Sequence, residues 1–320
     1  MSDEVHDVIM VGAGPSALAA AVYTTREDIE TVLFEKGVIG GLAATTDQVD
    51  NYPGFADGVP GLELAEQLQK QAERFGAKIE FGDVSSIKDE GDYKLVIVDG
   101  NEKKAKAVLI ATGSDYNKLG IPGEAENYGR GVHYCATCDG AFYRDKKLVV
   151  VGGGNSGVQE AIFLTRFATH IDLLVRSTVK ASEVLQHELA KFVESGKITV
   201  HLETSPVSID TGDDGKIKQV SATKSGEPIV FETDGVFVFV GLKPNTQFLE
   251  NSPIELDEYK LIKTNDKLET TMPGVFASGD VRGGATMQIA SAVGEGATAA
   301  LNIRQYLEGR LHSGETPKLY

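Results

Sequence analysis

The sequence predicts an α/β protein with two similar domains, the second inserted in the first. The main observation is an internal repeat, because Val11 to Ala21 (VGAGPSALAAA) aligns with Val151 to Ala161 (VGGGNSGVQEA) at a constant offset of 140 residues. Each copy follows a strand-like run and opens an apolar segment that can form a helix. A length of 320 residues also exceeds what one hydrophobic core usually serves. The chain is therefore expected to contain two domains built on one plan.

The repeat has the glycine spacing that suits a dinucleotide. In the first copy, Gly12 allows a tight turn, Gly14 lets the backbone approach a pyrophosphate at the helix amino terminus, and Ala17 permits close helix–strand packing. The second copy has Gly152, Gly154 and Gly157 at the same positions. One such motif alone is equally well explained as a tight turn, whereas two copies in matching contexts are more specific. We therefore predict an α/β fold of two Rossmann-like dinucleotide-binding domains, the second inserted in the first.

An acidic residue supports the first of these sites. Glu35 ends the next strand-like run, TVLFEK, about 20 residues after the motif, where a carboxylate can accept hydrogen bonds from the two hydroxyls of an adenosine ribose. The first domain is therefore expected to bind an adenine dinucleotide.

Two further β-rich runs place the domain boundaries. AVLIATG (Ala107–Gly113) and GVFVFVGLKPN (Gly235–Asn245) each close the unit that a glycine motif opened. The remaining segment contains GVFASGD and a helix-like stretch from Thr286 to about Leu307, without a glycine motif of its own, so it most simply completes the first domain. The predicted domains are residues 1–114 with 247–320, and residues 115–246.

The charge balance excludes one class of partner. The chain has 31 Lys and Arg against 47 Asp and Glu, and this net charge of −16 disfavours binding to a nucleic-acid backbone. No apolar run approaches the roughly 18 residues of a membrane span, and the start, MSDEVHDVIMVG, lacks a basic region followed by a long apolar stretch. We therefore expect no membrane association and a cytoplasmic location. Because thiols are kept reduced in the cytoplasm, a close cysteine pair there is catalytic or metal-binding rather than structural.

The only two cysteines, Cys135 and Cys138, are three positions apart, and Asp139 follows them directly. A CxxC pair at a helix start closes a small disulfide ring, and the helix dipole favours one thiolate, so the pair can cycle between disulfide and dithiol. The adjacent acid suits this exchange, because each leaving or attacking thiolate needs a proton moved. A structural zinc ion needs four ligands, and His133 adds only one. We therefore predict a redox pair and no metal, with zinc and an inert buried pair as weaker alternatives.

Taken together, the motifs resemble one family over nearly the whole chain. They are the repeated glycine motif, CATCD just before its second copy, VDNYPG (Val49–Gly54), ATG (Ala111–Gly113) and FASGD (Phe276–Asp280). This combination resembles the low-molecular-weight thioredoxin reductases, which are two-domain flavoprotein disulfide reductases. The resemblance implies an FAD-binding discontinuous domain and an NADPH-binding inserted domain that carries the redox cysteines. It also implies a homodimer whose substrate is the disulfide of thioredoxin or of a thioredoxin-like protein.

The same resemblance assigns roles to individual residues. Cys138 would exchange electrons with the flavin, Cys135 would attack the protein substrate, and Asp139 would donate and accept the proton. The residues expected at FAD are Gly12, Gly14, Ala17, Glu35, Asn51, Ala111, Gly113, Asp280 and Gln288. The residues expected at NADPH are Gly152, Gly154, Ser156, Arg176, Ser177 and Lys180.

Three segments depart from the family pattern. Leu42 stands where a glutamine usually follows the paired glycines, and TMQIA (Thr286–Ala290) lacks the usual arginine before Gln-Ala. The basic cluster for the 2′-phosphate of NADPH reads VRSTVKAS, with only Arg176 matching directly, Ser177 in place of a second arginine and Lys180 near the last one. Two cations and a hydroxyl can still bind a phosphate, less tightly than an arginine pair. NADPH is therefore preferred over NADH, and another electron donor is left open.

Two other functions are compatible with the same motifs. The scaffold could act as an FAD-dependent dithiol oxidase, with oxygen reoxidising the flavin, although an oxidase has no need of the second nucleotide motif. It could also be a nucleotide-binding redox sensor without enzymatic activity. A ferredoxin reductase of similar layout is disfavoured, because that family lacks the CxxC pair. NADPH-dependent disulfide reduction is the leading hypothesis.

Overall fold

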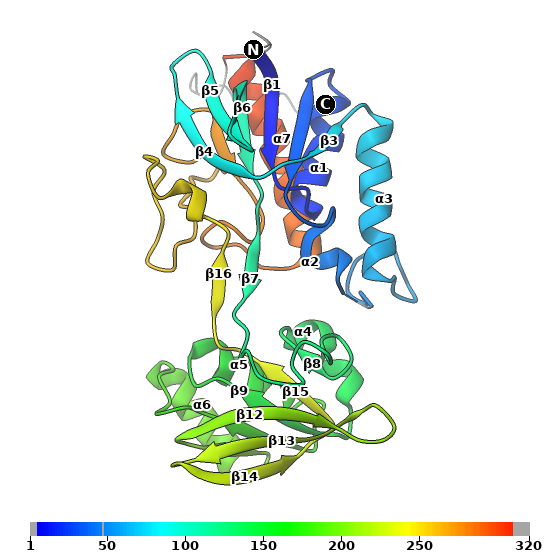
Figure 1. Cartoon of the computed structure of the whole chain (residues 1–320), viewed down its shortest axis with the longest axis vertical. Coiled ribbons are helices and arrows are strands. Elements are labelled where there is room, and N and C mark those ends of the chain that lie inside the picture. Colours follow the sequence, from blue (N-terminus) through cyan, green and yellow to red (C-terminus); the bar gives the residue numbers. More distant parts are fainter. Residues whose placement is uncertain (1–4, 47, 310–320) are drawn as a thin grey trace. The chain divides into compact units, whose positions relative to one another are not determined.

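The computed structural model describes residues 5–46 and 48–309. The chain divides into two compact units, one formed by Met1–Asp115 with Lys243–Tyr320 and the other by Tyr116–Leu242 (Figure 1). The first unit is discontinuous in sequence, and the second is a continuous segment between its two parts. The predicted α/β fold class is confirmed. Residues 1–4, on which part of the expected cytoplasmic location rests, lie outside the described residues.

A seven-stranded sheet forms the centre of the described part of the first unit, in the order β3-β2-β1-β6-β5-β4 with β17 also paired to β6. Its strands are β1 (Val5–Val11), β2 (Thr31–Glu35), β3 (Lys78–Phe81), β4 (Val84–Asp89), β5 (Lys94–Val98), β6 (Asn101–Ile110) and β17 (Val275–Ala277). β1, β2, β3, β6 and β17 are parallel, whereas β4, β5 and β6 form an antiparallel meander. The central strands are apolar on both faces, with Val8 to Val11 of β1 buried, as expected for a parallel sheet covered on both sides.

Helices pack on the parallel part of this sheet. They are α1 (Pro15–Thr25), α2 (Gly41–Ala44), α3 (Gly61–Arg74) and α7 (Ile289–Leu307), whereas the short 3-10 helix η2 (Gln247–Leu249) lies against β4. α7 begins later than the predicted Thr286, because Met287 has a left-handed backbone (φ 56°) and Gln288 is extended. No helix in residues 5–46 and 48–309 is both long enough and apolar enough to cross a membrane.

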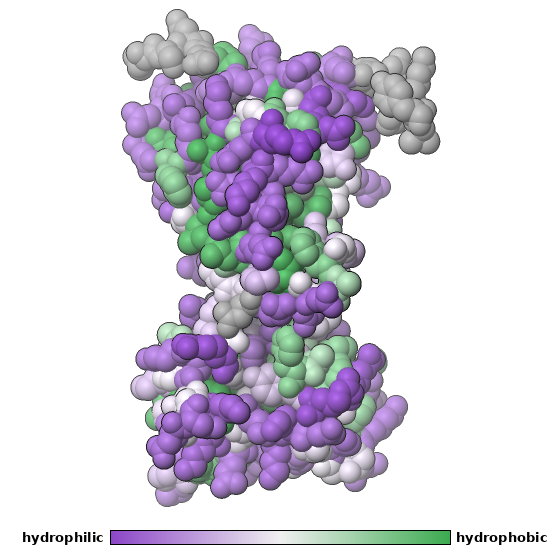
Figure 2. Space-filling model, turned by 90° about the vertical axis from the view of Figure 1, so that its right-hand side faces the viewer, coloured by the Kyte–Doolittle hydropathy of each residue, from purple (hydrophilic) through white to green (hydrophobic). Residues whose placement is uncertain are grey.

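α3 is amphipathic, with Leu64, Leu68 and Ala72 on its buried side. Figure 2 views the first unit from the side on which α3 lies and shows a band of hydrophilic side chains flanked by hydrophobic ones. A pocket of about 420 Å³ lies beside the helix. Its lining residues are Tyr52, Phe55, Leu64, Gln67, Leu68, Lys70, Gln71 and Arg74. None of the residues predicted at a cofactor or at the cysteines lines this pocket.

The second unit repeats the parallel arrangement on a smaller scale. Its sheet has the order β11-β10-β9-β15-β8, and each pair of neighbouring strands in it is parallel. The strands are β8 (Val132–His133), β9 (Lys147–Val151), β10 (His170–Leu174), β11 (Ile198–His201) and β15 (Gly235–Val238). The helices are α4 (Ala136–Asp139), η1 (Gly140–Tyr143), α5 (Asn155–Leu164) and α6 (Glu183–Glu194). An antiparallel meander of β12 (Thr204–Thr211), β13 (Ile217–Lys224) and β14 (Glu227–Glu232) completes the unit.

The two segments that connect the units are hydrogen-bonded to each other. β7 (Ser114–Tyr116) and β16 (Leu242–Pro244) form a two-stranded sheet (Figure 1). At its first-unit end, the Thr112 hydroxyl donates to the carbonyl of Asn245 at 2.8 Å, and the Asn245 amide donates to the carbonyl of Thr112 at 3.0 Å. The connecting segments are therefore fixed to each other by side chains as well as by backbone pairing.

A pair of glycines in α7 tests the packing of α1 on α7. A Cβ on Gly296 would overlap the carbonyl oxygen of Ser16 in α1, whereas a Cβ on Gly294 of the same helix would meet no atom within 4 Å. We expect Gly296→Ala to lower the free energy of unfolding by about 1–3 kcal/mol, because the helices must move apart. Gly294→Ala should raise it by up to about 1 kcal/mol through helix propensity. Urea unfolding of both variants checks this, and equal effects would contradict the packing described.

Candidate active site

The two cysteines form a disulfide at the start of α4, with their Cα atoms 5.3 Å apart. Cys135 is the N-cap residue, and its sulfur accepts a hydrogen bond from the backbone N–H of Cys138 at 3.2 Å. Both cysteines are half-buried, and Thr137 between them is exposed. This agrees with the expectation of a cysteine pair placed at a helix start. No group of three or more His, Cys, Asp or Glu side chains suited to a metal ion occurs within the part of the chain that the structure describes.

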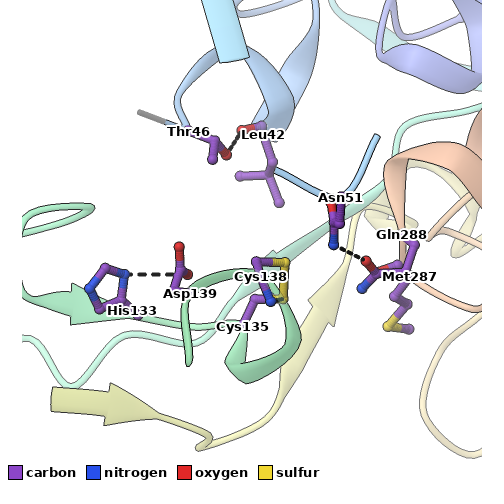
Figure 3. Close-up of a disulfide and its surroundings, with 9 residues drawn as sticks. All are labelled: Leu42, Thr46, Asn51, His133, Cys135, Cys138, Asp139, Met287 and Gln288. Carbon is purple, nitrogen blue, oxygen red and sulfur yellow. Dashed lines mark hydrogen bonds and ion pairs between the residues drawn. A yellow bond between two sulfur atoms is a disulfide. The ribbon is translucent and has the colours of Figure 1, made fainter. Parts of the chain in front are cut away.

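Asp139 is in contact with His133, a residue for which the sequence suggests only the role of a zinc ligand. Nδ1 of His133 lies 3.3 Å from a carboxylate oxygen of Asp139, and Nε2 lies 2.7 Å from the hydroxyl of Tyr143. Figure 3 shows Asp139 between His133 and the cysteine pair. No motif in the sequence points to Tyr143, although this residue lies only four positions after Asp139.

The first glycine turn lies between β1 and α1. Gly12 has φ +97°, and a Cβ there would lie 2.6 Å from the carbonyl oxygen of Ala111, so this position tolerates only glycine. Gly14 is the N-cap of α1, and a Cβ there would meet nothing within 4 Å. The turn therefore leaves open space in front of a helix amino terminus, where backbone amides favour an anion. Ala17 is buried at the helix start.

Glu35 is fixed beside this turn by two backbone amides. One carboxylate oxygen accepts from the N–H of Ala13 at 2.7 Å, and the other accepts from the N–H of Gly37 at 2.7 Å. A carboxylate has about four lone-pair sites, so each oxygen can still accept a hydroxyl. The structure thus orients Glu35 at the end of β2, next to the glycine turn.

The second glycine turn has the same construction. Gly152 has φ +145°, and a Cβ there would overlap the carbonyl oxygen of Phe239, whereas a Cβ on Gly154 would meet nothing within 4 Å. Gly154 is the N-cap of α5, and Ser156 in the first turn of that helix is exposed. The two copies of the sequence motif therefore give two matching turns, one in each unit.

The three residues expected at the 2′-phosphate lie in the loop after β10. Arg176, Ser177 and Lys180 are all exposed. The N–H of Lys180 donates to the carbonyl of Gly153 at 2.7 Å, which ties this loop to the second glycine turn. The structure thus brings the cationic loop and the turn together in the second unit.

In the first unit, two predicted residues far apart in sequence meet directly. The amide of Asn51 donates to the side-chain carbonyl of Gln288 at 3.1 Å (Figure 3). Leu42, which replaces the usual glutamine, is 38% exposed on α2. Its side chain offers no hydrogen bond, and its backbone carbonyl accepts from the Thr46 hydroxyl at 3.0 Å.

Asp280 is a largely buried acid. Burial raises the pKa of its carboxyl to about 6, and the negative charge of Glu295 adds to the rise. The carboxylate of Glu295 is itself held by Arg282 through two hydrogen bonds of 2.6 and 2.8 Å. Ser114 donates to the backbone carbonyl of Asp280, but no described residue is shown donating to its carboxylate. The carboxyl of Asp280 is therefore available to accept a hydrogen bond from a bound ligand.

Comparison with known proteins agrees with this geometry. A family model described as pyridine nucleotide-disulphide oxidoreductase matches residues 6–296. A thioredoxin reductase of Bacillus subtilis is 42% identical over 312 residues, which cover 96% of this chain and 97% of the relative. One from Listeria monocytogenes is 39% identical over 96% of this chain and 95% of the relative. The crystal structure of thioredoxin reductase from Streptococcus pyogenes has a TM-score of 0.90 and 38% identity, covering 96% of this chain and 100% of that chain.

The chain therefore belongs to the pyridine nucleotide-disulphide oxidoreductase family. Within this class, the relatives just described are thioredoxin reductases that match nearly the full length of both chains. The resemblance inferred from the sequence motifs is confirmed.

The pKa of Asp280 leads to a prediction for the FAD-free protein. The folded state holds a proton on Asp280 up to about pH 6, while the ordinary value is 3.8, so folding takes up a proton between these values. The free energy of unfolding should therefore fall as the pH rises through this window. We expect Asp280→Asn to remove this contribution, so that wild type loses stability relative to the variant from about pH 4 to about pH 6. Urea unfolding across this range measures it, and parallel curves would contradict the assignment.

Proposed function

We propose that this chain is an NADPH-dependent flavoprotein that reduces the disulfide of thioredoxin or of a thioredoxin-like protein. The observation that carries the proposal is the Cys135–Cys138 disulfide at the start of α4, beside Asp139, in the unit that also contains the second glycine turn. The full-length match to thioredoxin reductases supports the same reaction. Residues 1–114 with 247–320 then form the FAD-binding domain, and residues 115–246 form the NADPH-binding domain.

Two features of the first unit fit FAD. The space in front of Gly14 suits a pyrophosphate. Gly14 has no side chain to fill this space, and the amino terminus of α1 faces it. The buried carboxylate of Asp280 lacks a donor among the described residues, and a ribitol hydroxyl would supply one. The residues that would hold FAD are Gly12, Gly14, Ala17, Glu35, Asn51, Ala111, Gly113, Asp280 and Gln288. When bound, FAD supplies the two-electron chemistry that links NADPH to the disulfide.

The nucleotide-binding residues of the second unit are assigned in the same way. Gly152, Gly154 and Ser156 bind the pyrophosphate of NADPH at the amino terminus of α5. Arg176 and Lys180 provide two positive charges for its 2′-phosphate, and NADPH is therefore the preferred donor over NADH. The loop that carries them is hydrogen-bonded to the glycine turn through Lys180 and Gly153, which supports a shared ligand.

The cysteines and Asp139 carry out the exchange with the protein substrate. Cys135 attacks the substrate disulfide, and Cys138 then displaces the substrate by closing the Cys135–Cys138 disulfide. Cys138 is also the thiol that receives electrons from the flavin side. Asp139 takes a proton from a thiol before attack and returns it to the thiolate that leaves. This reversible use of a disulfide suits a reducing compartment, so we place the enzyme in the cytoplasm, and we infer a homodimer from the resemblance to the family.

Cysteine variants test the proposed path of electrons. In Cys135→Ser and Cys138→Ser, NADPH should still bleach the flavin absorbance under anaerobic conditions, because both nucleotide sites are intact. Reduction of thioredoxin should fall to background, since no exchangeable pair remains. Thr137→Ser changes the exposed residue between the cysteines and serves as the matched control, with wild-type turnover expected. Undiminished thioredoxin reduction by either cysteine variant would refute the proposal.

Charge variants test the choice of nucleotide. We expect Arg176→Ala with Lys180→Ala to raise the KM for NADPH by about tenfold or more, because two charge-assisted contacts to the 2′-phosphate are lost. The KM for NADH, which lacks that phosphate, should not change. Lys191→Ala, an exposed lysine on α6, is the control. Steady-state kinetics with both nucleotides measure these values. Equal changes in the KM for NADPH and the KM for NADH would show that the loop does not bind the 2′-phosphate.

A further inference from the structure

His133 occupies a buried position next to the redox pair. It ends β8, where it pairs in register with Phe237 of β15. The residue is 5% exposed, and its ring lies 5.1 Å from the Phe237 ring and 5.3 Å from the Tyr143 ring, between centroids. These contacts leave the imidazole little freedom to turn. Both ring nitrogens are used, Nδ1 toward Asp139 and Nε2 toward Tyr143.

The chemistry of the two partners indicates which ring nitrogen of His133 carries the hydrogen. Nδ1 of His133 lies 3.3 Å from a carboxylate oxygen of Asp139. Because a carboxylate offers only lone pairs, this nitrogen carries the hydrogen that faces it. Burial raises the pKa of the Tyr143 hydroxyl well above its usual range, and the negative charges of Asp139 and Asp234 add to the rise, so this hydroxyl keeps its proton. It can therefore donate to Nε2 of His133, which lies 2.7 Å away. The chain runs from Tyr143 through His133 to Asp139.

Few other charged groups reach this chain. Asp234 acts on Tyr143, and it is paired with Lys146 at 3.4 Å and accepts from the N–H of Lys147. Directly after β8, Tyr134 donates to Glu124, which also accepts from two backbone amides. Among the described residues, Asp139 is the only carboxylate within ion-pair distance of His133. A change at His133 therefore acts on Asp139 before any other acid.

We propose that His133 is a positioning residue for proton transfer at the Cys135–Cys138 pair, acting through Asp139 with Tyr143 behind it. The inference rests on the proposed function through the role given there to Asp139. His133 holds the carboxylate beside Cys138 (Figure 3) and stabilises its ionised form through the Nδ1–H that faces it at 3.3 Å.

Opening of the disulfide by a dithiol shows what this contact does. The attacking thiolate forms a bond to the sulfur of Cys135, the Cys135–Cys138 bond breaks, and Cys138 leaves with the electron pair. The Asp139 carboxyl gives its proton to that sulfur and becomes a carboxylate, and the Nδ1–H of His133 stabilises the new charge. In the reverse direction, Asp139 takes the proton back as the disulfide closes.

The test follows disulfide opening in the FAD-containing enzyme without NADPH. Dithiothreitol is added anaerobically between about pH 5.5 and pH 9, the free thiols are alkylated at set times, and mass spectrometry counts them. Each rate, that of wild type included, is divided by the fraction of dithiothreitol ionised at the same pH, which removes the pH dependence of the reagent itself. The variants are His133→Phe, which keeps a ring without a donor, and His133→Gln, which keeps one donor. Asp139→Asn identifies the inflection due to Asp139, and His187→Gln, at an exposed histidine of α6, is the control.

We expect H133F to slow disulfide opening near neutral pH by about tenfold, less than the roughly 100-fold expected for D139N. Because the carboxylate loses the Nδ1–H that faces it and favours its charged form, the inflection of the pH–rate profile should move to higher pH in H133F. H133Q should lie between H133F and wild type, and H187Q should match wild type. An H133F inflection at the wild-type position would overturn the inference, even if the rate fell uniformly, since uniform loss indicates a structural role only.

Two further measurements keep the outcome decisive. If H133F retains no FAD, Tyr143→Phe replaces it, because this change deletes only the hydroxyl bonded to Nε2. Its inflection should move in the same direction by a smaller amount, and an unmoved inflection would overturn the inference. NADPH-dependent reduction of thioredoxin by wild type is measured separately. Its absence would refute the proposed function and leave the dithiothreitol profiles to decide the role of His133.

Discussion

One steric constraint shapes both units: the chain leaving the first strand passes so close to a neighbouring backbone that no side chain fits between them. Gly12 meets the carbonyl of Ala111, and Gly152 meets the carbonyl of Phe239 in the same way. The strands involved are at the centre of each sheet, with β1 between β2 and β6 and β9 between β10 and β15. This close approach brings the amino termini of α1 and α5 to the carboxyl ends of the strands, where α/β folds bind nucleotides.

The redox cysteines belong to the second unit, whose sheet is centred on β9. β8 lies at the edge of the smaller sheet, and the chain passes from it directly into the four-residue helix that holds the disulfide. The pairing of β8 with β15 therefore fixes His133 against Phe237, and η1 returns Tyr143 to the same ring. A single short segment, 132–143, supplies the cysteines, the acid and the two residues that hold the acid. The position of Asp139 thus depends on the sheet as well as on its neighbour in sequence.

Much of this could be predicted from the sequence, because glycine turns and CxxC pairs are local patterns with a local physical cause. The α/β fold, the repeat and the cysteine pair were all found in that way. The contacts of His133 were not, because they depend on a strand 100 residues away, and neither was the Asn51–Gln288 hydrogen bond between distant segments. The predicted start of α7 is too early. Met287 has a left-handed backbone, which its residue type does not indicate because methionine usually favours a helix.

The central claim is that electrons from NADPH reach the Cys135–Cys138 disulfide. The most direct measurement incubates the oxidised wild-type enzyme anaerobically with NADPH, denatures it in the presence of an alkylating reagent and determines its mass. Because the chain has only two cysteines, the added mass reports this pair alone. The account predicts that NADPH bleaches the flavin and that both cysteines become alkylated. A bleached flavin with the disulfide still closed, or no reduction by NADPH of an enzyme that dithionite does reduce, would contradict it.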